Sequence, residues 1–182
     1  MAKTPGHPAR SGLSAEIGKR RPFEQSEVEA FLNIVRTAGI LESEAGRFFK
    51  AFNLSAPQYN ALRILRGHLA DAKHGVPSQT IGEELVAQVP DVTRLVDRLV
   101  EAGLAERSRT ESDRRMVLVR ITKAGLDLLA RIDRPLADLH AQQLGHLSKA
   151  DLAAISRLMV RARTRPGSSG PAEGNVRKRC PE

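Results

Sequence analysis

The chain has 182 residues and a formal net charge of +8, which is enough length for one domain with flanking tails. Its single cysteine, Cys180, excludes a disulfide scaffold, and it has no apolar run of about 18 residues and no signal-peptide pattern, so we expect a protein of the reducing cytoplasm with no membrane partner. With no Trp, one Tyr and five Phe, it lacks an aromatic platform for single-stranded bases, and a double-stranded partner is favoured.

The two ends of the chain are expected to be disordered tails, because residues 1–22 and 166–182 are rich in Gly, Pro, Ser and basic groups. Residues 1–22 hold five basic residues and one acidic residue, and residues 161–182 hold six and two. Residues 23–160 are therefore neutral, and the high net charge alone is weak support for a nucleic-acid partner.

A first helix is predicted within residues 23–53. Ser26 and Glu29 have the spacing of a capping box, in which Ser accepts from a free helix N–H and Glu reaches back. Gly39 and Gly46 weaken the helix by roughly 1 kcal/mol each. Apolar residues follow at helical spacing: Phe31, Val35, Ala38, Ala45, Phe48 and Phe52.

Three shorter helices are predicted next. The second helix starts at a capping box, Ser55 to Gln58, and buries Tyr59, Leu62 and Leu65. A polar loop then leads to a short helix after Ser78 that buries Ile81 and Leu85. The fourth helix runs from Val92 to Gly103, a natural residue to follow a helix end, and has one apolar face: Val92, Leu95, Val96, Leu99 and Val100.

Two β-rich segments, Leu104–Arg109 and Met116–Ile121, flank a polar turn at 110–115. Thr122 restarts a helix that continues past Pro135, where a kink is expected. Ser148 caps a last helix that ends near residue 163.

The predicted order is α-α-α-α-β-β-α-α, a mainly α, winged helix-turn-helix fold within residues 23–165. Its reading head comprises residues 55–125, and residues 23–53 and 123–163 supply dimerisation helices.

The fourth helix is predicted to read DNA. On its own it could be an ordinary surface helix, but a short helix precedes it at helix-turn-helix distance, and this pairing lays the second helix in the major groove. Thr93 and Arg94 would meet base edges and Arg98 a phosphate. Asp91 would repel phosphate, so it would accept from a cytosine amino group or make no contact.

The turn between the two β-rich segments is predicted to be a DNA-binding wing. Residues 93–123 carry eight basic and five acidic side chains. Arg114 and Arg115 stand at the tip of this hairpin, where Asp113 can hold an arginine extended. Narrow minor grooves attract such arginines.

Other functions have little support. The five histidines lack the spacing of a metal site, and no catalytic motif or Gly-rich phosphate loop is present, so we expect no metal, no cofactor and no enzymatic activity. The alternative that remains is a winged-helix protein–protein interaction module without sequence-specific DNA binding.

These residues resemble the MarR family of bacterial multiple-antibiotic-resistance-type regulators, from about Glu24 to Arg163. The family pattern is matched by Asp113, Arg115, Ile121-Thr122 and Gly125, and the recognition helix by 93–99. The resemblance implies a homodimeric, ligand-responsive regulator, usually a repressor, whose terminal helices form the dimer interface. One departure is the turn Val86–Pro90, which lacks the usual Gly and Ser/Thr and makes Val89 a poor N-cap.

A symmetric dimer would bury apolar side chains that a monomer leaves exposed to solvent, namely Phe31, Val35, Leu152, Ile155 and Met159. It would also set two recognition helices roughly 34 Å apart on a pseudo-palindromic duplex. A small apolar or aromatic effector is expected where the dimer helices meet the reading head, near Tyr59, Leu62, Leu126, Leu129 and Ile132.

Overall fold

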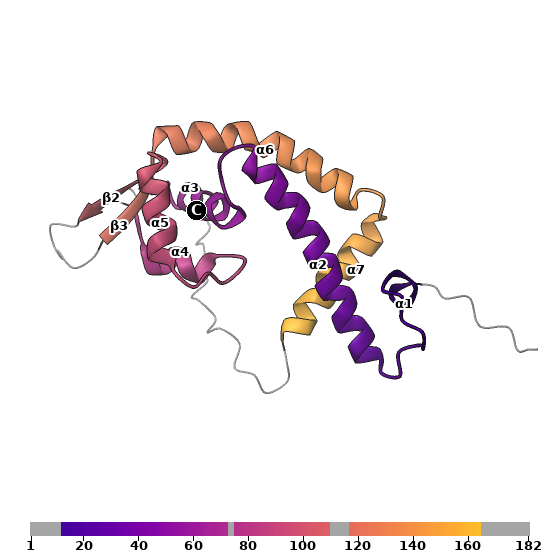
Figure 1. The fold of residues 1–182 in the computed structure, drawn as a ribbon. Coiled ribbons are helices and arrows are strands. Elements are labelled where there is room, and N and C mark those ends of the chain that lie inside the picture. The colour runs from indigo at the N-terminus through magenta and orange to yellow at the C-terminus, as the bar shows by residue number, and fades with distance from the viewer. Residues whose placement is uncertain (1–11, 73–74, 110–116, 165–182) are drawn as a thin grey trace, which may run out of the picture. The chain divides into compact units, whose positions relative to one another are not determined.

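The computed structural model describes residues 12–72, 75–109 and 117–164. Ten elements follow one another along these residues (Figure 1): α1 (Leu13–Glu16), α2 (Ser26–Lys50), α3 (Ala56–Gly67), β1 (Val76–Pro77), α4 (Ser78–Glu84), α5 (Val92–Glu101), β2 (Ala105–Arg109), β3 (Val117–Ile121), α6 (Lys123–Leu144) and α7 (Lys149–Arg163). The chain divides into two compact units, Met1–Asp133 and Arg134–Glu182. The helices, the hairpin strands and the mainly α, winged-helix class are as predicted, with two additional elements, α1 and β1.

The first unit is built from helices α3, α4 and α5 packed with a small antiparallel sheet of order β1-β3-β2. The hairpin strands pair in the register Ala105↔Ile121 to Arg109↔Val117, and they extend from one side of the three helices (Figure 1). Fully buried aliphatic side chains from helices and sheet form the core: Leu62, Ile81, Val96, Leu99, Val119, Leu129 and Ile132.

The C-terminal end of helix α2, which carries Phe48 and Phe49, packs against helix α3. The rings of Phe49 and Tyr59 stack with centroids 4.6 Å apart, and Phe48 meets Phe49 edge-on at 5.2 Å. These contacts place the end of α2 against α3 and bury the phenol ring of Tyr59.

Two predicted helix caps are confirmed and one is wrong. Ser55 Oγ accepts from the Gln58 N–H, and the Gln58 side chain accepts from the Ser55 N–H, as in a capping box. Ser148 Oγ accepts from the Asp151 N–H at 3.1 Å. At α2, however, Ser26 is already helical, the N-cap is Gln25 and no side chain caps the helix.

The segment predicted as a disordered tail at 1–22 contains helix α1. Leu13 is only 2% exposed, and Glu16 forms an ion pair with Arg36 of α2 at 2.7 Å. One buried leucine and one long-range ion pair order a segment whose composition resembles a tail. Residues 1–11 and the predicted tail 166–182 lie outside the described residues.

Strand β1 was not anticipated, because a two-residue strand containing a proline has no alternating pattern. It pairs with β3 through Val76↔Val119 and Pro77↔Leu118. Gly75 precedes it with φ +97°, a conformation that glycine adopts readily, and a Cβ there would lie 2.5 Å from the Val119 carbonyl oxygen.

The second unit contains the rest of α6 and helix α7. Helix α6 is continuous through Pro135, and α7 carries exposed apolar side chains at Ile155, Leu158 and Val160. No helix in the described part of the chain combines the length and the apolar character needed to span a membrane.

Candidate nucleic-acid interface

Helix α5 divides into a buried face and an exposed face. Leu95, Val96 and Leu99 are buried in the core. Of the residues predicted to meet DNA, Thr93, Arg94 and Arg98 are all exposed. A ten-residue helix is marginal in isolation, so this tertiary packing sets the direction in which the three side chains point.

The start of α5 is fixed by Asp91, so the poor cap expected at Val89, with Pro90 as the first helical residue, is not used. Asp91 is the N-cap, and its Oδ1 accepts from the Arg94 N–H at 2.8 Å. Pro90 lies before the cap rather than in the first turn. Asp91 therefore has a structural role besides the base contact predicted for it, and its carboxylate stabilises the positive end of the helix.

Close packing and a side-chain hydrogen bond hold α5 against α4 and α3. A Cβ on Gly82 of α4 would lie 2.9 Å from Cγ2 of Val92, so glycine permits the two helices to approach. Asn60 of α3 accepts the Val86 N–H at 2.9 Å through its Oδ1. The helix-turn-helix pair is thus fixed at its crossing point and at its turn.

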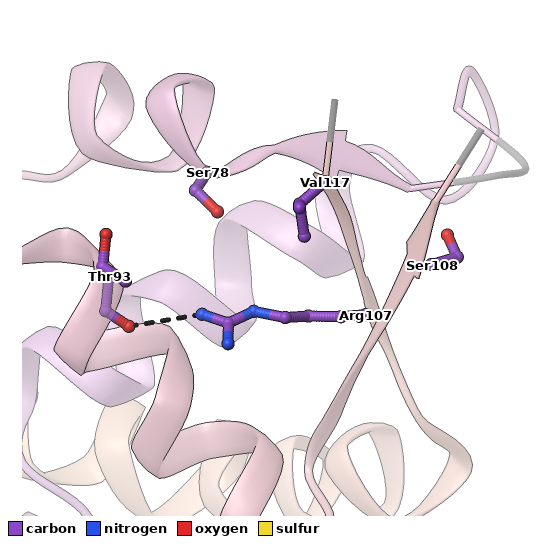
Figure 2. Close-up of a pocket in the computed structure, with 5 residues that line it drawn as sticks. All are labelled: Ser78, Thr93, Arg107, Ser108 and Val117. Atoms are coloured by element: carbon purple, nitrogen blue, oxygen red, sulfur yellow. Dashed lines mark hydrogen bonds between the residues drawn. The ribbon is translucent and has the colours of Figure 1, made fainter. Parts of the chain in front are cut away.

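Arg107 of β2 connects the hairpin to α5. Its guanidinium pairs with the carboxylate of Asp97 and donates to the Thr93 carbonyl oxygen at 3.4 Å. Figure 2 shows this side chain extending from the strand towards α5, across a cavity of about 480 Å³ lined by Ser78, Thr93, Arg107, Ser108 and Val117. The pair determines how the hairpin lies beside the exposed face of the helix.

A second ion pair lies on the hairpin itself. Arg120 donates to Glu106 Oε1 from Nε at 2.8 Å and from a terminal nitrogen at 2.5 Å, and the two residues face each other in the β2–β3 register. Cross-strand pairs of opposite charge stabilise a hairpin modestly. This pair therefore supports the two strands that lead to residues 110–116.

The end of α5 and the start of α6 meet at Thr122. Its Oγ1 donates to the Gly103 carbonyl oxygen at 2.7 Å and accepts from the Gly125 N–H at 3.1 Å. A Cβ on Gly125 would clash with the Leu104 carbonyl oxygen and lie 2.7 Å from Ile121 Cγ1. The Thr and Gly of the sequence pattern are thus required by this crossing.

Helix α3 is connected to α6 by a two-pronged ion pair. Arg66 donates to the two carboxylate oxygens of Asp133 at 2.6 and 3.1 Å. The hydrogen bond from Arg66 lowers the pKa of Asp133. Partial burial raises this pKa in opposition, and the positive charges of Arg66 and Arg63 lower it further. The same hydrogen bond raises the pKa of Arg66.

The remaining predicted site residues have different outcomes. Asp113, Arg114 and Arg115 lie outside the described residues. In the predicted effector region, Leu62, Leu129 and Ile132 are fully buried, Tyr59 is buried and Leu126 is half-buried. They pack as core, and none of them lines the cavity beside Arg107.

Sequence reasoning missed the residues that orient the interface. Arg107 and Asp97 are ten positions apart, and Asn60 and Val86 are 26 apart. In the sequence, Arg107 is only a charged residue in a predicted strand, and nothing indicates that its side chain reaches α5. Within the described residues, no group of three or more His, Cys, Asp or Glu side chains is arranged to hold a metal ion.

A helix-turn-helix pair whose second helix presents Thr93, Arg94 and Arg98 beside an antiparallel hairpin defines a winged helix-turn-helix protein. The MarR family model matches residues 52–116. The chain is 38% identical to a MarR transcription factor from Planctomyces limnophilus whose crystal structure covers 77% of this chain and 99% of its own, with a TM-score of 0.59. The protein belongs to the MarR family of transcriptional regulators, which are not enzymes.

Two further similar proteins agree with this family assignment. The chain is 26% identical over 153 residues to the transcriptional repressor IacR of Pseudomonas putida, covering 84% of this chain and 87% of that protein. The structure of a cysteine-to-serine mutant of MarR from E. coli, complexed with operator DNA, covers 84% of this chain and 99% of its own at 20% identity, with a TM-score of 0.62, and shows the shared fold.

Proposed function

We propose that this MarR-family regulator is a repressor that binds a pseudo-palindromic duplex operator as a homodimer. The observation that carries the proposal is the outer face of α5, on which Thr93, Arg94 and Arg98 stand opposite the buried Leu95 and Leu99. The related IacR is named a repressor, and the E. coli MarR mutant of the same fold was crystallised with operator DNA.

In this proposal α5 enters the major groove and the segment between β2 and β3 reaches the minor groove. Thr93 and Arg94 read base edges, because they lie in the first turn of the helix, whereas Arg98 lies one turn later and contacts phosphate. Arg114 and Arg115 supply the minor-groove charge, with Asp113 holding Arg115.

Exposed apolar side chains support the dimer. Phe31 is 62% exposed and Val35 is 51% exposed on α2, and Ile155 and Leu158 are exposed on α7. Large apolar side chains left exposed along a helix are typical of interfaces. A monomer at micromolar concentration in light scattering would contradict the dimer.

A small apolar or aromatic ligand would act at the region of Tyr59, Leu62, Leu126, Leu129 and Ile132. Because most of these side chains are buried in the single chain, a ligand would enter at the half-buried edge near Leu126 or displace packed side chains. It would lower DNA affinity only by favouring a conformation with a different spacing of the two reading heads.

The test begins with an operator selected from a random duplex library, against which binding is measured at two salt concentrations. Phosphate-driven binding should weaken steeply with salt. Arg94→Ala should change the base preferred at one position, whereas Arg98→Ala should weaken all sequences alike. Arg115→Ala should cost about 1–3 kcal/mol of binding free energy.

Arg20→Ala is the matched control, because it removes one exposed positive charge outside both the reading head and the dimerisation helices. It should leave operator affinity nearly unchanged. If no duplex is selected, or if Arg94→Ala and Arg20→Ala bind alike, the winged helix serves a protein partner instead.

A further inference from the structure

The turn between α4 and α5 has no glycine and is held from outside by α3. Helix α4 ends at Glu84, and its C-cap Leu85 has an extended backbone with φ −61° and ψ 134°. The N–H groups of positions 86–89 donate no backbone–backbone hydrogen bond to a described residue, and Pro90 has no N–H. The Val86 N–H is instead bound by Asn60 Oδ1 at 2.9 Å.

A second contact from α3 fixes the end of α4. His68 Nε2 lies 2.9 and 3.0 Å from the two carboxylate oxygens of Glu84, the last residue of α4. Asn60 lies on α3 and His68 is its C-cap, about two turns later, so the two residues share one face of the helix. Helix α3 therefore contacts both the end of α4 and the turn that follows it.

The two contacts differ in what they can control. The His68–Glu84 pair fixes α4, which precedes the turn. Asn60 fixes Val86, five residues before the N-cap Asp91, so it restrains the backbone that leads into α5. Because Val86 is 91% exposed and adds nothing to the core, we expect loss of this bond to cost the fold little, with water as the replacement acceptor.

We propose that Asn60 is a positioning residue for sequence recognition. By holding the Val86 N–H, it fixes the position of the turn that leads to the Asp91 cap, and hence where Thr93 and Arg94 meet the bases. The inference rests on the proposed DNA-reading function. It also explains how the turn keeps one geometry without the glycine that usually shapes it, since an external acceptor restrains the backbone.

The test compares Asn60→Ala with Asn60→Asp, which keeps an oxygen acceptor for Val86. The readout is a ratio of affinities, for the selected operator and for the same duplex changed at the base pair that Arg94→Ala no longer distinguishes. We expect this ratio to fall about tenfold in Asn60→Ala, within the range that a single misread base pair costs. Asn60→Asp should keep the ratio within about twofold, although its charge weakens binding to both duplexes.

Asn33→Ala is the matched control, because Asn33 is exposed on α2 and its side chain donates to the Glu29 carbonyl oxygen of the same helix. It should leave both affinities unchanged. Thermal unfolding should be nearly the same for all variants, which separates a positioning role from loss of the fold.

Amide hydrogen exchange gives an independent measurement on the wild-type protein. We expect the Val86 amide to be protected despite the exposure of its side chain, and exchange at the rate of a free amide would overturn the inference. An unchanged affinity ratio in Asn60→Ala would also overturn it and leave the proposed function standing. A wild-type protein that prefers no duplex would overturn both.

Discussion

Replacing Gly125 with alanine separates intrinsic helix propensity from packing. Gly125 lies in the first turn of α6, where propensity alone predicts that alanine stabilises the protein by about 1 kcal/mol. The structure predicts the opposite sign. A Cβ at this position would clash with the Leu104 carbonyl oxygen and lie 2.7 Å from Ile121 Cγ1, whereas ordinary contacts begin at 3.4 Å.

The size of the effect follows from these contacts. Relieving the clash requires a shift of the order of 1 Å, and overpacking of this kind costs about 1–3 kcal/mol. The shift also disturbs the hydrogen bond from the Thr122 N–H to the Leu104 carbonyl oxygen, at 3.1 Å, which contributes about 1 kcal/mol. After the gain in propensity is subtracted, we expect a net loss of about 1–3 kcal/mol.

Urea unfolding followed by circular dichroism measures this loss as a lower midpoint at unchanged slope. Gly46→Ala is the control, because Gly46 lies inside α2 with no atom of the chain within 4 Å of its would-be Cβ, and this variant should gain about 0.5–1 kcal/mol. A Gly125→Ala protein as stable as wild type would refute the packing argument.

Three further predictions concern stability. Gly82→Ala should lose about 1–3 kcal/mol through its clash with Val92, and adding Val92→Ala should recover part of the loss, which a double-mutant cycle in urea would measure. Ser55→Ala should lose about 1 kcal/mol with its capping box, seen as a lower thermal midpoint. The pKa of Asp133 is lowered in the folded state, so its pair with Arg66 stabilises the protein above about pH 4, and this stabilisation is lost as the pH falls further. Asp133→Asn should remove this part of the pH dependence of stability. The effect should be no more than about 1 kcal/mol, because the pair is largely exposed.

Local signals in the sequence predicted most of the fold, because they act within a few residues. The Ser55 cap contacts a residue three positions away, and the apolar face of α5 repeats with the period of a helix. The same reasoning failed at Ser26, where the spacing of a capping box is present but the helix starts at the serine itself. A capping box needs an extended Ser backbone as well as the right spacing.

The orientation of the site could not be predicted, because it depends on contacts between distant residues. Arg66 and Asp133 are 67 positions apart, and a single sequence gives no sign that they meet. Strand β1 depends likewise on β3, which is distant in the sequence. In the turn before α5, the sequence analysis left Val89 as a poor N-cap. Asp91 serves instead, because its carboxylate can accept from the helix and the valine side chain cannot.

The position of helix α5 can therefore be altered without substituting any of the residues that we propose to face DNA. Asp91 holds its start, Arg107 holds its middle through Asp97, and Thr122 holds the loop at its end. The exposed Arg107–Asp97 ion pair contributes little to the stability of the fold, and the Asp91 cap contributes about 1 kcal/mol. Base recognition, however, depends on displacements of less than about 1 Å in hydrogen-bond geometry. Substitutions at these anchors should change which sequence is preferred more than they change thermal stability.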